Sequence, residues 1–192
     1  MDARARKILF VVALAAFAVF SVYRLARMIQ LDRVEGAAIW VAVLLLLAVC
    51  VLTVAAVLRR VSGLAAHVGR QRAGATVVPA FTTAETLDEA RAAGASSGGW
   101  LPVGGSPISL AVLPDRVEVW ARKEQAPRWS IQRTPGAAQT ASGTYGSRTV
   151  EALRVSDGVS AVTVVPAYRP LRAAGGFATD DVARAVEAVR GG

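Results

Sequence analysis

The side chains that most often carry out catalysis or bind metal ions are scarce in this chain. It has one histidine, His67, and one cysteine, Cys50, and Cys50 lies inside a long apolar run. Because that cysteine is expected to lie in lipid, a Cys-His nucleophile is excluded in a monomer, and a zinc site needs more of these residues at a suitable spacing. A serine nucleophile would need His67 as its base, but no serine in a strand-turn-helix context lies near it in the sequence. We therefore expect no catalytic residues and no metal site.

Two further patterns that could serve a substrate are incomplete. The pairs Gly98-Gly99 and Gly104-Gly105 lack the Lys-Ser/Thr of a phosphate-binding loop, and no clear helix follows them. Asp180 and Asp181 are adjacent, so on a helix they point to different sides. This placement suits stabilisation of the helix dipole better than paired acid-base work. We expect no cofactor and no enzymatic activity.

Basic residues are the better candidates for binding a ligand. The chain has 22 Lys and Arg against 14 Asp and Glu, a net charge of +8. They are scattered, without the clustered aromatic and basic residues of a nucleic-acid site, so we expect membrane lipid and no nucleic acid. The candidate lipid contacts are Arg59, Arg60, Arg70, Arg72, Arg122, Lys123 and Arg128.

Two apolar runs predict a transmembrane hairpin ahead of most of these residues. The runs are Ile8 to Tyr23 and Ala37 to Leu58. A bilayer core of about 30 Å needs about 20 helical residues, which the second run supplies. We predict helices at about 8–28 and 37–68, the second extending out of the membrane, within a unit 1–69. The expected interface anchors are Lys7, Tyr23, Arg24 and Trp40.

The first run has an alternative interpretation as a cleaved signal peptide. Arg4, Arg6 and Lys7 form a basic start, and Ala16-Phe17-Ala18 has the shape of a cleavage site. A retained helix is favoured because the apolar residues continue through Val22 with no polar stretch before it.

The distribution of basic residues predicts sidedness. Lys and Arg are retained on the cytoplasmic side, and the connecting loop holds fewer of them than the two flanks together. We therefore expect a multi-pass protein of the inner (plasma) membrane with both ends cytoplasmic. The loop holds Arg24, Arg27 and Arg33, and the flanks hold Arg4, Arg6, Lys7, Arg59, Arg60, Arg70 and Arg72. The segment after Leu58 is either a basic amphipathic helix on the membrane surface or a solvated helix end.

The remainder predicts an antiparallel β domain at 108–192, joined by a linker at 70–107. The linker holds a short helix at about 83–93, for which Thr82 with Glu85 fits a capping box. Gly136 to Ser147 is small and polar, so we expect a mobile loop there. The domain ends with a closing helix at about 180–190 that carries an apolar stripe. The predicted strands are 108–112, 117–121, 128–133, 149–155 and 159–166.

This order of elements resembles the pleckstrin-homology-like domains of small bacterial membrane proteins. The resemblance rests on the hairpin 110–120, the strand 128–131, the Asp157-Gly158 turn and the helix 179–190. The abundance of Ala, Val, Arg and Gly is similar to that of high-GC, actinobacterial proteins. The resemblance implies a strongly bent antiparallel sheet plugged by the last helix, in a non-catalytic module that recognises lipids or protein segments. Lipid-binding members carry basic residues around the first hairpin loop, which here is only Pro114-Asp115-Arg116.

Two functions are therefore expected as alternatives. The first is a membrane-anchored interaction or scaffolding module, for example an accessory subunit of a membrane complex, with a protein partner that the sequence does not identify. The second is an anionic-lipid-binding protein of the membrane surface. A homo-oligomer is compatible with the small residues Ala38 and Ala42, which lie one helical turn apart.

Overall fold

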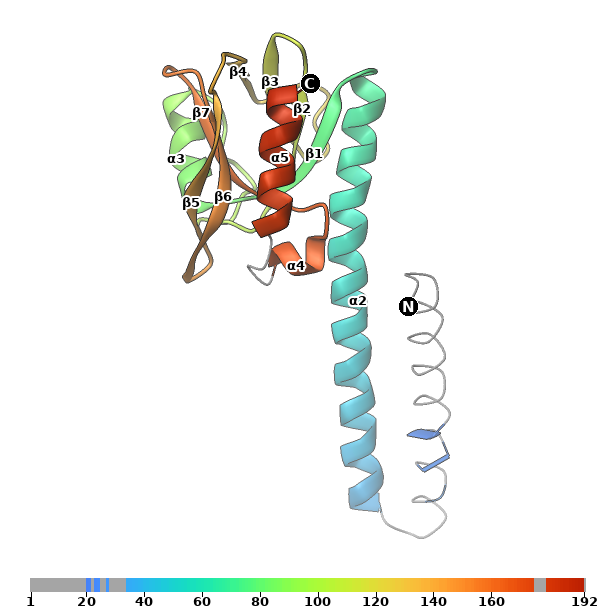
Figure 1. Ribbon diagram of the computed structural model, residues 1–192. Helices are drawn as coiled ribbons and strands as arrows, with labels where there is room; N and C mark the ends of the chain where they lie inside the picture. Colours follow the sequence, from blue (N-terminus) through green and yellow to red (C-terminus); the bar gives the residue numbers. More distant parts are fainter. Residues whose placement is uncertain (1–19, 22, 25–26, 28–33, 175–178, 192) are drawn as a thin grey trace. The chain divides into compact units, whose positions relative to one another are not determined.

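The computed structural model describes residues 20–21, 23–24, 27, 34–174 and 179–191 (Figure 1). The chain divides into two compact units, Met1–Thr53 and Val54–Gly192, and each is described by itself. The elements are α2 (Val34–Gln71), β1 (Thr76–Thr82), α3 (Ala84–Ala92), β2 (Pro107–Val112), β3 (Arg116–Ala121), β4 (Trp129–Gln132), β5 (Ala138–Tyr145), β6 (Arg148–Ser156), β7 (Ala161–Pro166), α4 (Pro170–Ala174) and α5 (Thr179–Gly191).

The first unit holds most of the apolar part of α2, which continues to Leu58 in the second unit. Within the described ranges, α2 is the one helix long and apolar enough to cross a membrane. The hydroxyl of Thr53 donates to the Val49 carbonyl at 2.8 Å, so this polar group has a partner without water. The guanidinium of Arg24 lies 5.3 Å from the ring centroid of Trp40, and Tyr23 is exposed. The predicted first membrane helix lies mostly outside the described residues, as does Lys7.

The second unit is built on a seven-stranded antiparallel sheet in the order β4-β3-β2-β1-β7-β6-β5. β1 pairs with β2 over Thr76–Phe81 but with β7 only over Ala80–Thr82, so the sheet changes direction at β1. The indole N–H of Trp129 donates to the Ala161 carbonyl at 3.3 Å, which links β4 to the start of β7. The sheet is therefore strongly curled, and the predicted α+β class with an antiparallel domain is confirmed.

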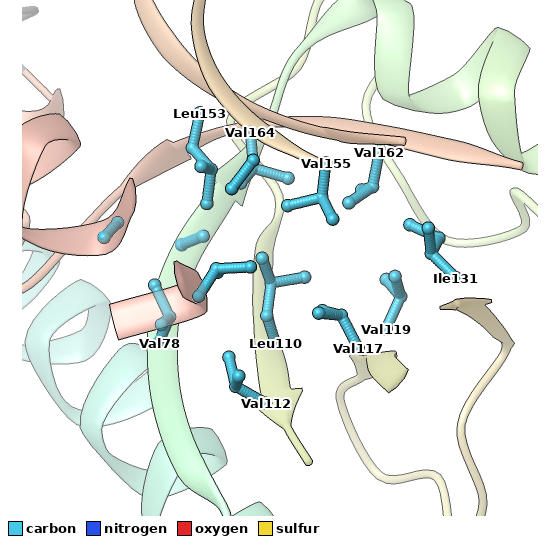
Figure 2. Close-up of a cluster of buried hydrophobic side chains, with 14 of the residues drawn as sticks. Val78, Leu110, Val112, Val117, Val119, Ile131, Leu153, Val155, Val162 and Val164 are labelled. Carbon is cyan, nitrogen blue, oxygen red and sulfur yellow. The ribbon is translucent and has the colours of Figure 1, made fainter. Parts of the chain in front are cut away.

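The core lies inside this curl. Val78, Leu110 and Val119 are fully buried and face Leu153 and Val164 from the far side (Figure 2). α5 fills the opening between them, and its buried side chains are Val182, Ala185, Val186 and Val189. The predicted closing helix and its apolar stripe are thus confirmed.

β1 occupies a segment that the sequence analysis assigned to a linker. Pro79 weakens the sequence signal for a strand there, because proline cannot donate a hydrogen bond to a ladder. The structure accommodates Pro79 just before β1 begins to pair with β7, where its carbonyl accepts the N–H of Ala167 at 2.7 Å. The β domain therefore begins well before residue 108.

β5 replaces the mobile loop expected at Gly136 to Ser147, and that prediction was wrong. β5 pairs with β6 along its whole length, from Ala138 opposite Val155 to Tyr145 opposite Arg148. Small residues are needed here because α3 starts close by. A Cβ on Gly143 would lie 2.8 Å from the Thr83 side chain. A composition too poor in apolar residues for a core strand is therefore suited to an edge strand beneath a helix end.

α3 forms where a short helix was expected, but its cap differs from the prediction. Thr83 is the N-cap, and its capping box is completed by Thr86. Thr82 instead ends β1, where its hydroxyl accepts the N–H of Ser106 at 3.0 Å. Glu85 accepts the N–H and hydroxyl of Thr144, both at 2.8 Å, and so fastens α3 to β5.

The second half of α2 belongs to the β domain. Leu64 and Val68 are buried against Ala111 and Trp120 on the outer face of the sheet. Val61 packs one turn earlier in a second cluster with Phe81. The apolar face of this segment therefore covers the sheet, which corrects both expected alternatives, a helix on the membrane surface and a solvated helix end.

Candidate functional site

Four of the seven candidate lipid contacts meet in one groove of about 270 Å³ between α2 and the turn that follows β3. Arg59 and Arg60 come from α2, and Arg122 and Lys123 come from the turn. We call this the basic groove, and Gly63, Leu64 and His67 complete its lining. The groove exists because Leu64 and Val68 dock α2 on the sheet beside the end of β3.

The four cations of the basic groove have no ion-pair partner within the described part of the chain, and Glu124, the acidic residue next to Lys123, is paired with Arg128. Their side chains take part in no described hydrogen bond or ion pair, and all four residues are exposed. Cations held near one another repel, and an anion placed among them is attracted to each. The arrangement therefore suits an anionic ligand whose oxygens accept several hydrogen bonds, as a phosphate group does.

A second hollow of about 430 Å³ adjoins the basic groove, because Arg60 and Arg122 line both. Its far wall is the loop after α3, including Trp100 and Leu101. A ligand that fills both would meet cations at one end and an indole ring and an exposed leucine at the other. That combination suits an amphipathic molecule better than a fully charged one.

Two backbone features shape the groove. Lys123 has a φ of 67°, the one positive φ at a non-glycine residue in the described chain. This conformation costs roughly 1 kcal/mol or more for a residue with a Cβ. Gly63 lies in the interior of α2, yet a Cβ there would meet no atom within 4 Å. The missing side chain of Gly63 therefore leaves space in the groove and serves no close packing contact.

His67 is fixed to the turn by a contact that explains its position. Its Nε2 lies 3.1 Å from the carbonyl oxygen of Glu124. No group of three or more His, Cys, Asp or Glu residues that could hold a metal ion occurs among the described residues. His67 thus helps to hold α2 against the turn that supplies Arg122 and Lys123.

Three candidate lipid contacts lie outside the basic groove. Arg72 donates to the carboxylate of Glu118 at 2.7 Å and stacks over Trp120. Arg128 donates to Glu124 and to the carbonyls of Ser96 and Gly98, and its guanidinium lies 4.3 Å from the Trp100 centroid; it lines the adjoining hollow. Arg70 is exposed and lines neither hollow.

Glu118 is the acidic group that holds the end of α2 to the sheet. Its side chain is 2% exposed, and it accepts hydrogen bonds from Arg72, from Arg116 at 3.0 Å and from the Trp120 indole at 3.1 Å. Burial raises the pKa of this carboxyl, but the hydrogen bonds from Arg72, Arg116 and Trp120 outweigh burial and hold the pKa below its ordinary value of 4.5.

This pKa predicts a specific acid sensitivity. A carboxyl whose pKa is lower in the folded state stabilises the fold above pH 4.5, and that contribution is lost as the pH falls below it. The melting temperature of the intact protein should therefore fall more steeply between about pH 5 and pH 3 than that of Glu118→Gln. All other carboxyls are common to both proteins. Melting temperatures that fall equally in the two proteins over this range would contradict the assignment.

A different pair of carboxylates, on α3, fastens the helix to the sheet. Glu89 accepts the hydroxyl of Thr163 at 2.7 Å and its N–H at 2.5 Å, and Arg154 lies 3.7 Å away. Burial raises the pKa of Glu89 despite these bonds. Glu85 is bonded to Thr144 on β5 in the same manner. Each of these acidic groups is thus engaged with a strand.

Sequence reasoning found the four cations of the groove but missed Gly63, Trp100 and Leu101. The signal for Gly63 was a glycine in the interior of a helix, where it costs about 1 kcal/mol relative to alanine. The positions of Trp100 and Leu101 depend on how a long loop folds back, for which the sequence has no periodic signal. Comparison of the chain with protein-family models, with curated proteins and with solved structures finds no match.

Proposed function

We propose that the protein is a membrane-anchored, non-enzymatic module that binds the phosphate-bearing headgroup of an anionic membrane lipid in the basic groove. The observation that supports this most strongly is the convergence of Arg59, Arg60, Arg122 and Lys123, which form no described ion pairs, directly after the apolar run of α2. Each basic residue near an anionic membrane surface is worth about 1 kcal/mol of attraction.

The location of the groove favours a lipid over a soluble anion. Arg59 and Arg60 follow Leu58, the last residue of the apolar run, so the groove opens within about one helical turn of the end of that run. The adjoining hollow adds Trp100 and Leu101, which suit the glycerol and upper acyl region of a phospholipid. Free phosphate would use the cations alone.

We also propose a membrane arrangement for the chain. Two membrane helices with both ends in the cytoplasm of a bacterial cell are supported by the two apolar runs and by the distribution of Lys and Arg. A pleckstrin-homology-like assignment is supported by the strand order, the curl of the sheet and the closing helix α5. The β2–β3 turn contributes only Arg116, which is paired with Asp115 and Glu118, so the proposed ligand site lies elsewhere.

The experiment is a calorimetric titration of the full-length protein in detergent with three probes. These are short-chain phosphatidylglycerol, short-chain phosphatidylcholine and inorganic phosphate. The test variant is Arg122→Gln with Lys123→Gln, which leaves Arg59 and Arg60 on α2 unchanged. The control, Arg70→Gln with Arg91→Gln, removes the same charge from exposed positions outside the groove.

We expect the intact protein and the control to bind phosphatidylglycerol, and the groove variant to bind it roughly thirtyfold more weakly, at about 1 kcal/mol for each charge. Phosphatidylcholine should bind weakly to all three proteins. Equal affinity for phosphate and phosphatidylglycerol would identify a soluble anion as the ligand. An equal loss of affinity for phosphatidylglycerol in the control and groove variants would contradict the proposed site.

Gly63 allows binding to be separated from stability. Gly63→Leu should place a side chain in the groove, because a Cβ there meets nothing within 4 Å. We expect binding of phosphatidylglycerol to be lost while the free energy of unfolding is unchanged or rises by up to about 1 kcal/mol from better helix propensity. The control is Ser62→Leu, an exposed neighbour that does not line the groove. Retained binding by Gly63→Leu would exclude this groove as the site.

A protein-docking role is the second candidate, and one observation favours it. β5 ends the sheet and is eight residues long, with Gln139, Thr140 and Ser142 exposed. Such an edge can pair with a strand of another chain. Salt separates the two functions, because attraction between exposed charges weakens with ionic strength and a packed interface persists. A stoichiometric protein that co-purifies through a high-salt wash would favour docking.

A further inference from the structure

Apolar side chains are exposed at the end of the β domain where the apolar run of α2 ends. Leu101 is 57% exposed, Val103 is 53% exposed and Leu171 is 53% exposed. A single exposed leucine is ordinary on a protein surface. Leu101, Val103 and Leu171 differ from such single residues, because separate parts of the chain bring them to the same level along α2.

The contacts of α4 and of the loop after α3 establish that level. Ala173 of α4 is fully buried in the cluster that contains Val61 and, at its margin, Val57 of α2. Leu101 lines the same hollow as Arg60. Residues 57–61 span about 6 Å of helix, so α4 and the loop flank α2 at one height. Figure 1 shows α4 at the lower end of the β domain, opposite the end at which α2 terminates.

The loop that carries Leu101 and Val103 is held firmly. Gly105 donates its N–H to the Thr82 carbonyl at 2.8 Å, and Gly146 donates to the Val103 carbonyl at 2.7 Å. Gly104 lies so close to β1 that a Cβ there would be 2.6 Å from the Thr82 carbonyl oxygen. The two apolar side chains are therefore displayed by a fixed turn.

Basic residues accompany these apolar side chains. Arg172 follows Leu171 on α4, and Arg148 begins β6 beside the turn that contacts Val103. Both arginines are exposed, and neither guanidinium group makes a hydrogen bond or ion pair to any described residue. Apolar tips with adjacent cations are the composition of a surface that enters the headgroup region of an anionic bilayer.

We propose that this end of the β domain rests on the lipid bilayer, with Leu101, Val103 and Leu171 inserted in its interfacial region and Arg148 and Arg172 against lipid phosphates. The inference rests on the proposed insertion of α2 in the membrane. It shares Leu101 with the hollow beside the basic groove, whereas Val103 and Leu171 line neither hollow. The β domain would then contact the bilayer directly, in addition to being linked to it through α2.

Spin labels measure how deeply these positions lie in the bilayer. In full-length protein carrying Cys50→Ala, a nitroxide is attached through Leu101→Cys, Leu171→Cys or, as the control, Val159→Cys. Val159 is 92% exposed in the β6–β7 turn, where Asp157 accepts the N–H of Gln132, at the opposite end of the sheet. Each protein is placed in vesicles of phosphatidylcholine and phosphatidylglycerol in equal amounts, and collision rates with oxygen and with a water-soluble nickel complex are measured.

We expect the ratio of oxygen to nickel collisions to be several-fold higher at positions 101 and 171 than at 159. A label at 101 or 171 that collides with the nickel complex as often as the label at 159 would contradict the proposed contact with the bilayer. This result would leave the headgroup titration of the basic groove unaffected, so the two proposals can fail separately.

Discussion

Replacing Val182 and Val186 together by Asp is expected to unfold the β domain while α2 stays in the membrane. Val182 is fully buried and Val186 is 7% exposed, both in the main core. Each substitution removes roughly 1.5 kcal/mol or more of apolar burial and adds an unpaired buried carboxylate that costs several kcal/mol. The sum is comparable with the entire stability of a domain, about 5–15 kcal/mol. The measurements are the thermal unfolding transition and membrane retention after alkaline extraction.

The matched control for this variant lies on the same helix. Ala183 and Glu187 have the same spacing as Val182 and Val186 but are exposed. Ala183→Asp with Glu187→Asp should therefore leave the unfolding transition nearly unchanged. An unchanged transition in the valine variant would show that α5 does not close the core.

Trp120→Ala should have the next largest effect, about 3–5 kcal/mol of destabilisation. The Trp120 side chain is fully buried between the sheet and α2, where it packs with Leu64 and Val68. Its loss also removes the ring under Arg72 and the N–H donor to Glu118. We expect lower stability and faster hydrogen exchange in α2 from Val61 to Gln71, because that segment would lose its docking surface.

Trp100→Ala is the control for the loss of an indole. Trp100 contacts Trp129 and Arg128, with no described contact to the buried face of α2. It should change stability less and leave exchange in α2 as it is. If Trp120→Ala did not alter exchange after Val61, the second half of α2 would not be held by the sheet.

The elements predicted correctly from the sequence are those with a local signal. The stripe Val182, Val186 and Val189 has helical spacing, and the Asp157-Gly158 turn is complete within a few residues, because Asp157 Oδ1 accepts the N–H groups of Val159 and Ser160. β1 and β5 were missed because their stability comes from partners distant in sequence. β1 contains Pro79, and β5 has small side chains that only the nearby Thr83 explains.

The candidate site could likewise be predicted only in part from the sequence. The identities of Arg59, Arg60, Arg122 and Lys123 could be chosen from charge and position, but their meeting depends on α2 docking beside the end of β3. The engagement of Arg72 depends on Glu118 and Trp120 having the same orientation on β3, two residues apart. The contacts of Arg72 with Glu118 and Trp120 could not be predicted without knowing which helix covers this face of the sheet.

The most direct test of the central claim is native mass spectrometry of the full-length protein purified from its own membranes in mild detergent. We predict that the intact protein and Arg70→Gln with Arg91→Gln each retain an anionic phospholipid. Arg122→Gln with Lys123→Gln, and Gly63→Leu, should lose it. Retention of the same lipid by both groove variants, or a neutral lipid in the intact protein, would contradict the proposal that the basic groove binds an anionic headgroup.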